Sequence, residues 1–435
     1  MPKITFMGAG STIFAKNVLG DSMMTPALAE STIALYDINE TRLKESKLML
    51  DAINLNAGGR ATIETYLGVD ARRDALRGAK YVVNAIQVGG YEPCTVTDFE
   101  IPKKYGLRQT IADTLGIGGI FRALRTIPVM LDFARDMEAV CPDAWLLNYT
   151  NPMAMLTGAM LRMTGVKTVG LCHSVQICVP HLLEGLGMGS GEGVQSKIAG
   201  INHQAWLLEV TRDGVDLYPE IKRRALERTE KHNDMVRYEI MRRFGYYVTE
   251  SSEHNAEYTP WFIKARYPEL IDRFNIPLDE YPRRCIKQIA DWNERRDELT
   301  KDPTLTHTRS HEYASYIMEA METGAPVKIG GNVMNTGLIT NLPKNAVVEV
   351  PCLVDKSGVT PCYIGDLPEQ CAALNRTNIN VQALTIEAAR TLKKDYVYQA
   401  ALLDPHTAAE LSIDDIVAMC DDLIEAHGSW LPAYR

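Results

Sequence analysis

Short apolar runs alternate with helical stretches through the first 175 residues, and this alternation restricts the fold more than any other feature of the sequence. A strand, a helix and a second strand in succession build a parallel sheet, because a parallel connection has to cross over the sheet. The sequence therefore predicts an α/β fold with a parallel sheet in this part of the chain. The expected strands are Lys3–Met7, Thr32–Tyr36, Tyr81–Ile86, Ala144–Leu147 and Thr168–Leu171.

The pattern changes near residue 195, where longer amphipathic stretches begin and only a few strand-like pieces such as Ala346–Val350 remain. No stretch rich in Gly, Ser or Pro separates the two parts, so we expect them to pack as one body. We therefore predict a parallel α/β domain of residues 1–195 and a mixed α+β, helix-rich domain of residues 196–435. The expected helices of the second part are Leu226–Phe244, Tyr281–Leu299 and Asn378–Lys394.

The charge balance of the chain excludes several partners. The sequence has 46 basic and 55 acidic residues, a formal net charge of −9, whereas nucleic acids and anionic membranes require an electropositive face. No apolar run reaches the roughly 18 residues that span a bilayer. The nine cysteines contain no Cys-x-x-Cys pair, and a chain of this length needs no disulfides. We expect a soluble cytoplasmic protein that binds neither nucleic acid nor membrane.

A glycine turn directly follows the first expected strand and opens a helix. Gly8 and Gly10 would let the backbone approach a pyrophosphate, which then lies at the helix N-terminus beside Ser11 and Thr12. Asp37 ends the second strand, where an acid binds the ribose hydroxyls of NAD and repels the extra phosphate of NADP. The third glycine of the full fingerprint is absent, and a pair of glycines also occurs by chance. With the surrounding strands, the pattern favours an NAD site.

Two loops carry polar side chains suited to a ligand, and the first of them follows an expected strand. Asn151 precedes a proline, which holds it extended with its amide free for hydroxyl groups, but Asn-Pro is also an ordinary turn into a helix. Asp113 lies in a glycine-rich loop before a helix, where it would either protonate a leaving group or cap a turn. Residues 246–254 combine aromatic and polar side chains, a composition suited to sugars. These segments favour a small polar ligand without identifying it.

A thiol and two imidazoles point to a metal. Cys172, His173 and His203 would reach one sheet edge, where they could hold a divalent ion with positions open to substrate. Their spacing matches no structural zinc pattern, and a lone Cys or His is more often an ordinary core residue. A second pair, His307 and His311, would share a helix face, but its polar surroundings favour a solvated helix start.

Taken together, these segments resemble glycoside hydrolase family 4 over essentially the whole chain. The matching stretches are residues 4–11, 148–152, 172–173 and 200–203. Within the family the sequence is most similar to α-galactosidases, through residues 88–100, 171–176 and 249–261. The resemblance implies a Rossmann-like N-terminal domain of the lactate and malate dehydrogenase type, NAD, a divalent metal (usually Mn²⁺), and a homodimer or homotetramer.

The resemblance also implies an unusual hydrolysis of terminal α-galactosides such as melibiose or raffinose. In that scheme NAD⁺ takes a hydride from C3 of the sugar, and the metal stabilises the enediolate that forms when C2 loses a proton. The C1–O bond then breaks by elimination, water adds, and the hydride returns. Cys172 and His203 match the metal ligands of the family, and Asn151 matches its substrate-binding asparagine. His173 matches a position that is acidic in phospho-glycosidases and histidine in α-glucosidases.

The acid and the base are assigned by the same resemblance. Asp113 matches an acidic position near the leaving group. The C2 base is assigned to Asp234, with Tyr238, one helical turn further on, as the alternative. Phospho-sugar enzymes of the family place an arginine where Cys94 stands in this chain, so the resemblance favours an unphosphorylated sugar.

Three alternatives stay open from the sequence. A family 4 α-glucosidase, α-galacturonidase or glucuronidase would use the same site, and a uronidase would add a cationic pocket. A 2-hydroxy-acid dehydrogenase shares the nucleotide fold but needs an arginine clamp and a His–Asp relay, which no loop clearly provides. A non-enzymatic NAD sensor would exchange no C2 hydrogen with solvent.

Overall fold

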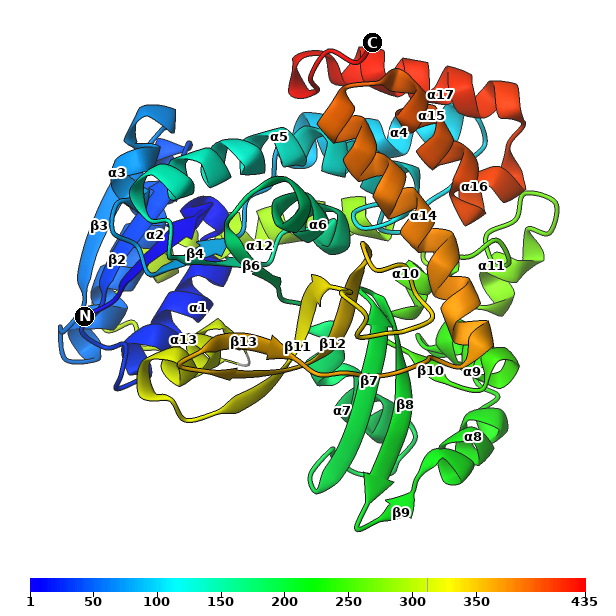
Figure 1. The fold of residues 1–435 in the computed structure, drawn as a ribbon, viewed down its shortest axis with the longest axis horizontal. Coiled ribbons are helices and arrows are strands. Elements are labelled where there is room, and N and C mark those ends of the chain that lie inside the picture. The colour runs from blue at the N-terminus through cyan, green and yellow to red at the C-terminus, as the bar shows by residue number, and fades with distance from the viewer. Residues whose placement is uncertain (311) are drawn as a thin grey trace.

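One sheet of 13 strands runs through the computed structural model, which describes residues 1–310 and 312–435. The strand order is β10-β8-β7-β12-β11-β6-β5-β4-β1-β2-β3, with β13 paired to β12 and β9 paired to β8. The colour gradient of Figure 1 shows the N-terminal strands on one side of the molecule and the later strands on the other.

The N-terminal half of the sheet is parallel, as the sequence predicts. Its strands are β1 (Lys3–Met7), β2 (Thr32–Asp37), β3 (Thr62–Leu67), β4 (Tyr81–Asn84), β5 (Trp145–Asn148) and β6 (Lys167–Gly170). All five pairings among them are parallel, in the order 3-2-1-4-5-6. This is the order of the Rossmann fold, so the predicted fold class is confirmed. Strand β3 was not among the predicted strands, because its exposed position at the sheet edge gives it little apolar character.

Helices cover both faces of these strands (Figure 1). Those of the first half are α1 (Ile13–Met24), α2 (Glu40–Asn56), α3 (Arg72–Leu76), α4 (Val96–Lys104), α5 (Gly116–Val140), α6 (Met153–Met163) and α7 (Ser174–Gly185). Helix α2 begins where the Asn39 side chain accepts a hydrogen bond from the backbone N–H of Arg42, which satisfies one free donor of the first turn.

The second half adds antiparallel strands to the same sheet. They are β7 (Val194–Ile201), β8 (Gln204–Arg212), β9 (Val215–Asp216), β10 (Tyr247–Val248), β11 (Val327–Met334), β12 (Val347–Asp355) and β13 (Gly358–Pro361). The sequence analysis underestimated this strand content, because β7 and β8 are covered on both faces over part of their length and lack a simple alternation.

The helices of the second half pack partly against the first. They are α8 (Tyr218–Glu227), α9 (Met235–Phe244), α10 (Ser252–Glu257), α11 (Glu269–Arg273), α12 (Glu280–Lys301), α13 (Ala314–Thr323), α14 (Glu369–Thr391), α15 (Lys394–Leu403), α16 (Pro405–Glu410) and α17 (Ile413–His427). The continuous helix predicted over Leu226–Phe244 is wrong, because a non-helical segment between α8 and α9 interrupts it.

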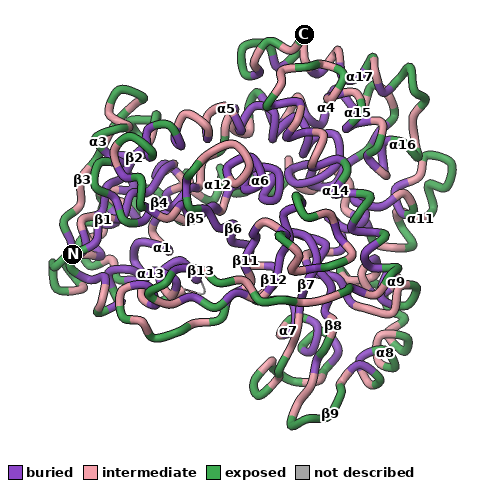
Figure 2. The backbone as a smooth tube through the Cα atoms, in the orientation of Figure 1, coloured by how far each residue is buried: buried purple, intermediate pink, exposed green. Residues whose placement is uncertain are grey.

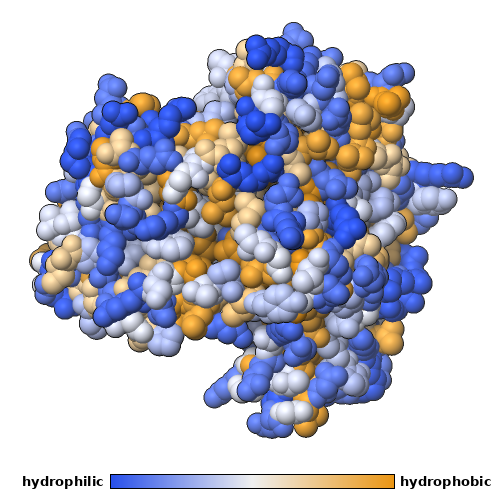
Figure 3. All heavy atoms as spheres, in the orientation of Figure 1, coloured by the Kyte–Doolittle hydropathy of each residue, from blue (hydrophilic) through white to orange (hydrophobic). Residues whose placement is uncertain are grey.

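The two halves share a hydrophobic core. One buried cluster joins Ile120 of α5 and Met155 of α6 to Ile386, Val397 and Met419 of the C-terminal helices α14, α15 and α17. Figure 2 shows the buried backbone continuing from one half into the other, and Figure 3 shows apolar atoms in the middle of the visible face with hydrophilic atoms around them. The division at residue 195 stays a prediction. Among the described residues, no helix is long and apolar enough to cross a membrane.

One row of paired residues crosses the sheet below the edge where the predicted site residues lie. The row is Asn84, Asn148, Gly170, Asn332, Glu349 and Gly200, on β4, β5, β6, β11, β12 and β7. Cys172 lies two residues after Gly170, just past the end of β6, and His203 lies three residues after Gly200, just past the end of β7. Two residues that are far apart in the sequence thus lie close to the same row of the sheet.

Candidate active site

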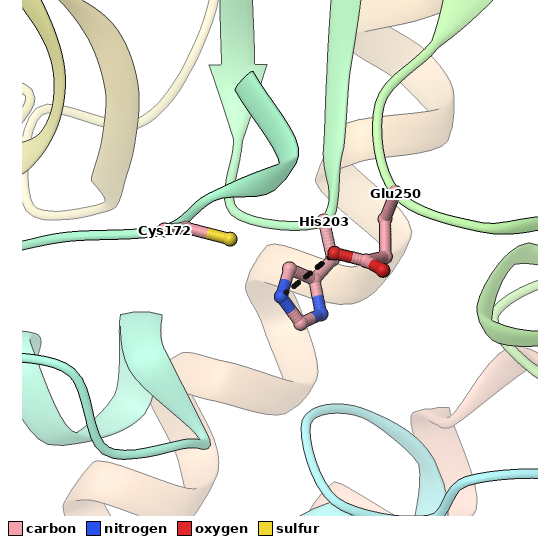
Figure 4. Close-up of side chains that lie close together, drawn as sticks. All are labelled: Cys172, His203 and Glu250. Atoms are coloured by element: carbon pink, nitrogen blue, oxygen red, sulfur yellow. Dashed lines mark ion pairs between the residues drawn. The ribbon is translucent and has the colours of Figure 1, made fainter. Parts of the chain in front are cut away.

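Three potential metal ligands meet at this edge. The ligand atoms of Cys172, His203 and Glu250 all lie within 4.8 Å of one another. Cys172 follows β6, His203 lies in the turn between β7 and β8, and Glu250 follows β10, so three separate segments converge on one point (Figure 4). Cys172 and His203 are buried, and Glu250 is partly buried. The structure thus joins the two residues chosen from the sequence with a third one.

Hydrogen bonds orient the imidazole of His203. Its Nδ1 lies 3.1 Å from the hydroxyl of Tyr258, and its Nε2 lies 3.3 Å from Oε2 of Glu250. A metal-ligating histidine is commonly fixed in this way, because a bond at one ring nitrogen orients the other toward the ion. Burial lowers the pKa of His203, which favours the neutral ring that binds metals. Burial also raises the pKa of the Cys172 thiol well above its usual range, and a bound cation would reverse that effect.

Both turn residues of this cluster have left-handed backbone conformations. His203 has φ 62° and Glu250 has φ 65°, a region that costs non-glycine residues about 1–3 kcal/mol. Thr12 in the glycine turn and Ala112 beside Asp113 also have positive φ. Such conformations persist where the surrounding structure enforces them, and they concentrate at functional sites.

Asp113 is connected to Glu250 through His254, within a series of charged groups. His254 connects the two carboxylates, with Nε2 3.7 Å from Oδ1 of Asp113 and Nδ1 3.5 Å from Oε1 of Glu250. Asn151 Nδ2 donates to Oδ2 of Asp113 at 3.3 Å, and Arg122 Nη1 lies 3.7 Å from the same oxygen. Asp113 and Asn151, both predicted from the sequence, are therefore neighbours.

The charges around Asp113 decide which group carries a proton. Burial raises the pKa of Asp113, but the hydrogen bond from His254 and the charge of Arg122 hold it well below its usual range. Burial lowers the pKa of His254, but Glu250 and Asp113 raise it to about 9. The protonated member of this pair at neutral pH is therefore His254, and Asp113 is a carboxylate.

His173 points to a different partner. Its Nε2 lies 2.5 Å from Oε2 of Glu312, and 41% of its side chain is exposed. The ring also lies beside the aromatic rings of Tyr149 and Tyr313, with centroids 5.9 Å and 6.3 Å away. An imidazole held on one side and open on the other can contact a ligand.

The two predicted bases are occupied by other contacts. Asp234 pairs with Arg237 at 2.5 Å, and it accepts hydrogen bonds from Tyr247 and Ser252. The Tyr238 ring packs against His232, and its hydroxyl lies near Gly185. In the described part of the chain, neither side chain has a hydrogen bond or ion pair with Cys172, His203 or Glu250.

The glycine turn has the tight geometry expected of a nucleotide site. A Cβ at Gly8 would lie 2.8 Å from the carbonyl oxygen of Ala85, and one at Gly10 would lie 2.7 Å from Oδ2 of Asp37. The N–H of Gly10 donates to that oxygen at 2.6 Å, which holds Asp37 beside the turn. Among the described residues, the buried hydroxyl of Ser11 has no hydrogen-bond partner. An orphaned hydroxyl at a helix N-terminus fits a phosphate ligand.

Contacts connect the glycine turn to the metal cluster. Gly8 approaches the backbone of Ala85 and Ile86, and the hydroxyl of Thr150 donates to the carbonyl oxygen of Ile86 at 3.2 Å. The next residue, Asn151, bonds to Asp113. The predicted nucleotide, substrate and metal residues therefore form a continuous series along one sheet edge.

Sequence reasoning missed Glu250, His254, Arg122 and Glu312. Glu250 and His254 belong to residues 246–254, which the sequence marks as rich in polar and aromatic groups without assigning a role to any of them. Arg122 and Glu312 follow no local pattern, and only tertiary packing brings them to the site.

The alternative pair of histidines has another explanation. His307 is buried, and its Nε2 lies 2.6 Å from Oδ1 of Asp21 on α1. The prediction of a solvated helix start is wrong for His307, because α13 begins later, at Ala314, and the chain before it packs on α1. His311 lies outside the described residues.

The chain matches known proteins over most of its length. The family described as "Family 4 glycosyl hydrolase" matches residues 3–188, and its "C-terminal domain" matches residues 198–407. An "Alpha-galactosidase" of Bacillus subtilis (strain 168) is 66% identical over the full length of both chains, and one of Rhizobium meliloti (strain 1021) is 37% identical over 99% of this chain and 89% of the relative.

A solved structure shares the fold. The 6-phospho-alpha-glucosidase from gut microorganisms in complex with NAD and Mn²⁺ has a TM-score of 0.83 and 19% identity, with 100% of each chain covered. Two family signatures over nearly the whole chain, together with a relative that is 66% identical, establish the relationship. The chain belongs to glycoside hydrolase family 4.

Proposed function

We propose that the protein is an NAD- and divalent-metal-dependent α-galactosidase that cleaves terminal α-galactosides. The observation that carries this proposal is the convergence of a thiol, an imidazole and a carboxylate on the same sheet edge as a nucleotide-type glycine turn. The name of the relative that is 66% identical supports the choice of galactose. A 2-hydroxy-acid dehydrogenase would have no use for such a cluster.

Cys172 and His203, with Glu250 beside them, would hold the metal. Thiolate, imidazole and carboxylate oxygen form a mixed donor set that suits Mn²⁺ or a similar divalent ion and leaves positions open for sugar oxygens. Such an ion supplies Lewis acidity, which stabilises negative charge that develops on the C2 and C3 oxygens. The orientation of His203 by Tyr258 fits this role.

The glycine turn and Asp37 would hold NAD, with Ser11 and Thr12 at the phosphates. The cofactor supplies reversible hydride transfer at C3. Asp37 is held by the N–H groups of Gly10 and Asn39, so the carboxylate is fixed in place and its remaining lone pairs can accept ribose hydroxyls.

The remaining residues would bind the sugar and move protons. The Asn151 amide donates to Asp113 and is in place to bind a sugar hydroxyl. Beside it, the protonated His254 and the carboxylate of Asp113 form the group closest to an acid on the leaving-group side. His173 would contact the sugar from its exposed side. Asp234 stays the proposed base and Tyr238 the alternative; the Ser252 hydroxyl, which donates to Asp234, belongs to a residue two positions after Glu250.

A substrate panel tests the proposal. Nitrophenyl α- and β-galactosides, α-glucoside, α-galacturonide and the 6-phosphates are each assayed with and without NAD⁺ and Mn²⁺. We expect cleavage of the α-galactoside alone, dependent on both additions, and exchange of the C2 hydrogen in heavy water. Faster cleavage of the galacturonide would reassign the substrate to a uronide, with Arg122 as the cation for its carboxylate. Cleavage without NAD⁺ would contradict the mechanism.

Location and assembly are proposals of the same kind. All nine cysteines are free, as expected for a cytoplasmic protein. We propose a homodimer or homotetramer and a boundary between two domains near residue 195. Light scattering after size exclusion measures the oligomeric state, and limited proteolysis tests the domain boundary.

A further inference from the structure

His173 and Cys172 are both held by one neighbouring segment. The carboxylate of Glu312 lies 2.5 Å from Nε2 of His173, and the hydroxyl of the next residue, Tyr313, donates to the backbone carbonyl of Cys172 at 3.0 Å. Two consecutive residues thus fix two consecutive residues of the site. Glu312 is only 8% exposed, so its carboxylate is committed to this contact.

The segment that carries Glu312 is anchored on α1. We call residues 305–310 and 312–313 the bridging segment. Asp21 on α1 accepts hydrogen bonds from the N–H and the hydroxyl of Ser310, at 2.7 Å and 2.6 Å, and it pairs with His307 at 2.6 Å. Asp21 is fully buried, and a Cβ on its neighbour Gly20 would lie 2.7 Å from His307, so the segment packs tightly on α1.

A continuous series of contacts therefore runs from α1 to His173. The Ser310 hydroxyl donates to Asp21 and accepts from the N–H of Glu312 at 3.2 Å, and Glu312 then meets His173. Helix α1 begins directly after the glycine turn proposed to hold NAD. One segment thus connects the nucleotide half with the residue that faces the sugar.

We propose that Glu312 is a positioning residue, which fixes the His173 imidazole for contact with the sugar, and that Asp21 keeps Glu312 in place. The proposal rests on the proposed function of His173 as a sugar-binding residue. A ring with three torsional options and a large exposed fraction loses orientation without a fixed partner, and a small displacement of a contact group reduces both affinity and rate. Because Glu312 is buried and its carboxylate contacts Nε2 of His173, it acts on the sugar through His173.

A double-mutant cycle tests this dependence. Glu312→Ala and Glu312→Gln are made in the wild-type protein and in a His173→Ala background. kcat and KM for nitrophenyl α-galactoside are measured with saturating NAD⁺ and Mn²⁺. We expect Glu312→Ala to lower kcat/KM by about 30-fold, mainly through KM, and Glu312→Gln, which keeps an acceptor oxygen, to recover part of the loss. In the His173→Ala background neither change should have a further effect.

The matched control is Glu319→Gln. Glu319 lies on α13, seven positions further along, and pairs only loosely with Arg309 at 3.7 Å. It should leave kcat and KM within twofold. Equal losses in both backgrounds would show that Glu312 acts through the general structure and not through His173, which overturns the proposal. A loss of Mn²⁺ affinity in Glu312→Ala, measured by electron paramagnetic resonance, would overturn it as well, because the effect would then pass through Cys172.

Galactose binding separates this proposal from the proposed function. Calorimetric titration of the same six proteins (wild type, His173→Ala, and the two Glu312 variants in each background), loaded with NAD⁺ and Mn²⁺, reports the coupling without turnover. If the wild type binds galactose but does not cleave the galactoside, the proposed function fails while the coupling remains measurable. If Glu312→Ala does not fold, as judged by circular dichroism, the nearly isosteric Glu312→Gln is used for the test. A galactose affinity and a KM of Glu312→Gln that both equal those of the wild type would then contradict the proposal.

Discussion

The nucleotide turn and the metal cluster lie on the same sheet edge, yet they are built in opposite ways. The turn is local: Gly8, Gly10 and Ser11 follow one strand, and Asp37 ends the neighbouring strand. The cluster is assembled from three distant segments and contains buried ionisable groups and two left-handed turn residues. A local motif tolerates change in its surroundings, whereas a converging cluster depends on every segment that contributes to it.

The difference has an energetic reason. Backbone N–H groups and a helix terminus provide the attraction at the turn, so no net charge has to be buried there. The metal cluster and its neighbours His254 and Asp113 place several ionisable groups in a region largely closed to solvent, where unpaired charge is costly. A bound cation would relieve that cost. We therefore expect substitutions at the cluster to have larger effects than substitutions at the turn.

The largest effect is expected from Cys172→Ser. A serine hydroxyl stays protonated and is a poor ligand, so the cluster loses its anionic donor. We expect Mn²⁺ affinity to fall by roughly 100-fold and kcat/KM by roughly 1,000-fold. Electron paramagnetic resonance of Mn²⁺ and steady-state kinetics measure the two quantities. Cys362→Ser, which changes an exposed thiol, is the control and should equal wild type. Full Mn²⁺ affinity in Cys172→Ser would exclude this cysteine from the metal site.

Glu250→Gln should have the next largest effect. The amide keeps the shape of the side chain but removes the negative charge near His203 and His254. We expect Mn²⁺ affinity to fall by about 10- to 100-fold, with NADH binding unchanged. Glu209→Gln, an exposed carboxylate on β8, is the matched control. Unchanged Mn²⁺ affinity would reduce the cluster to two ligands.

Asp37→Ala tests the nucleotide side. The loss of the ribose-binding carboxylate should weaken NADH binding by about 10-fold, as measured by fluorescence titration, and improve binding of NADPH relative to NADH. Mn²⁺ affinity should stay within twofold, because the Asp37 carboxylate accepts its hydrogen bonds from Gly10 in the turn and from Asn39, two residues further along the chain. Asp51→Ala, on the exposed face of α2, is the control. An equal loss of Mn²⁺ affinity would show that the two regions are not separable.

The same contrast explains what could be predicted from the sequence. The strands β1, β2, β4, β5 and β6 and the glycine turn are predictable because each depends on residues close together in the chain. Cys172 and Asn151 were chosen through their positions after predicted strands and through the resemblance, and His203 was chosen through the resemblance. The antiparallel strands β7, β8 and β11 were not predicted from the sequence, since their residues gain apolar partners only in the assembled sheet.

The missed site residues have the same cause. Glu250 and His254 lie in a segment whose composition suggested a polar ligand. Their place in the site follows only from their contacts with His203 and Asp113, which the fold creates. Glu312 reaches His173 across 139 positions of the chain, and no sequence period encodes such a contact. The choice of Tyr238 as the alternative base rested on helical spacing from Asp234, and it stays a prediction.

The smallest effect, and the most informative about coupling, is expected from Asp21→Asn. Burial raises the pKa of Asp21, but the hydrogen bonds from His307 and Ser310 outweigh it and lower the pKa. Its carboxylate therefore stabilises the fold above pH about 4, and this contribution is lost as the pH falls through the lowered pKa of the folded state. Urea unfolding should show Asp21→Asn less stable than wild type at pH 7, with the difference shrinking below pH about 4.

The same variant should raise KM for the galactoside by about threefold, because the bridging segment loosens around Glu312. Asp21 belongs to the nucleotide half. If the two regions were independent of each other, its substitution would leave the KM for the galactoside unchanged. If Asp21→Asn lowers stability but leaves KM unchanged, α1 holds the segment only structurally, and the two regions share an edge without depending on each other.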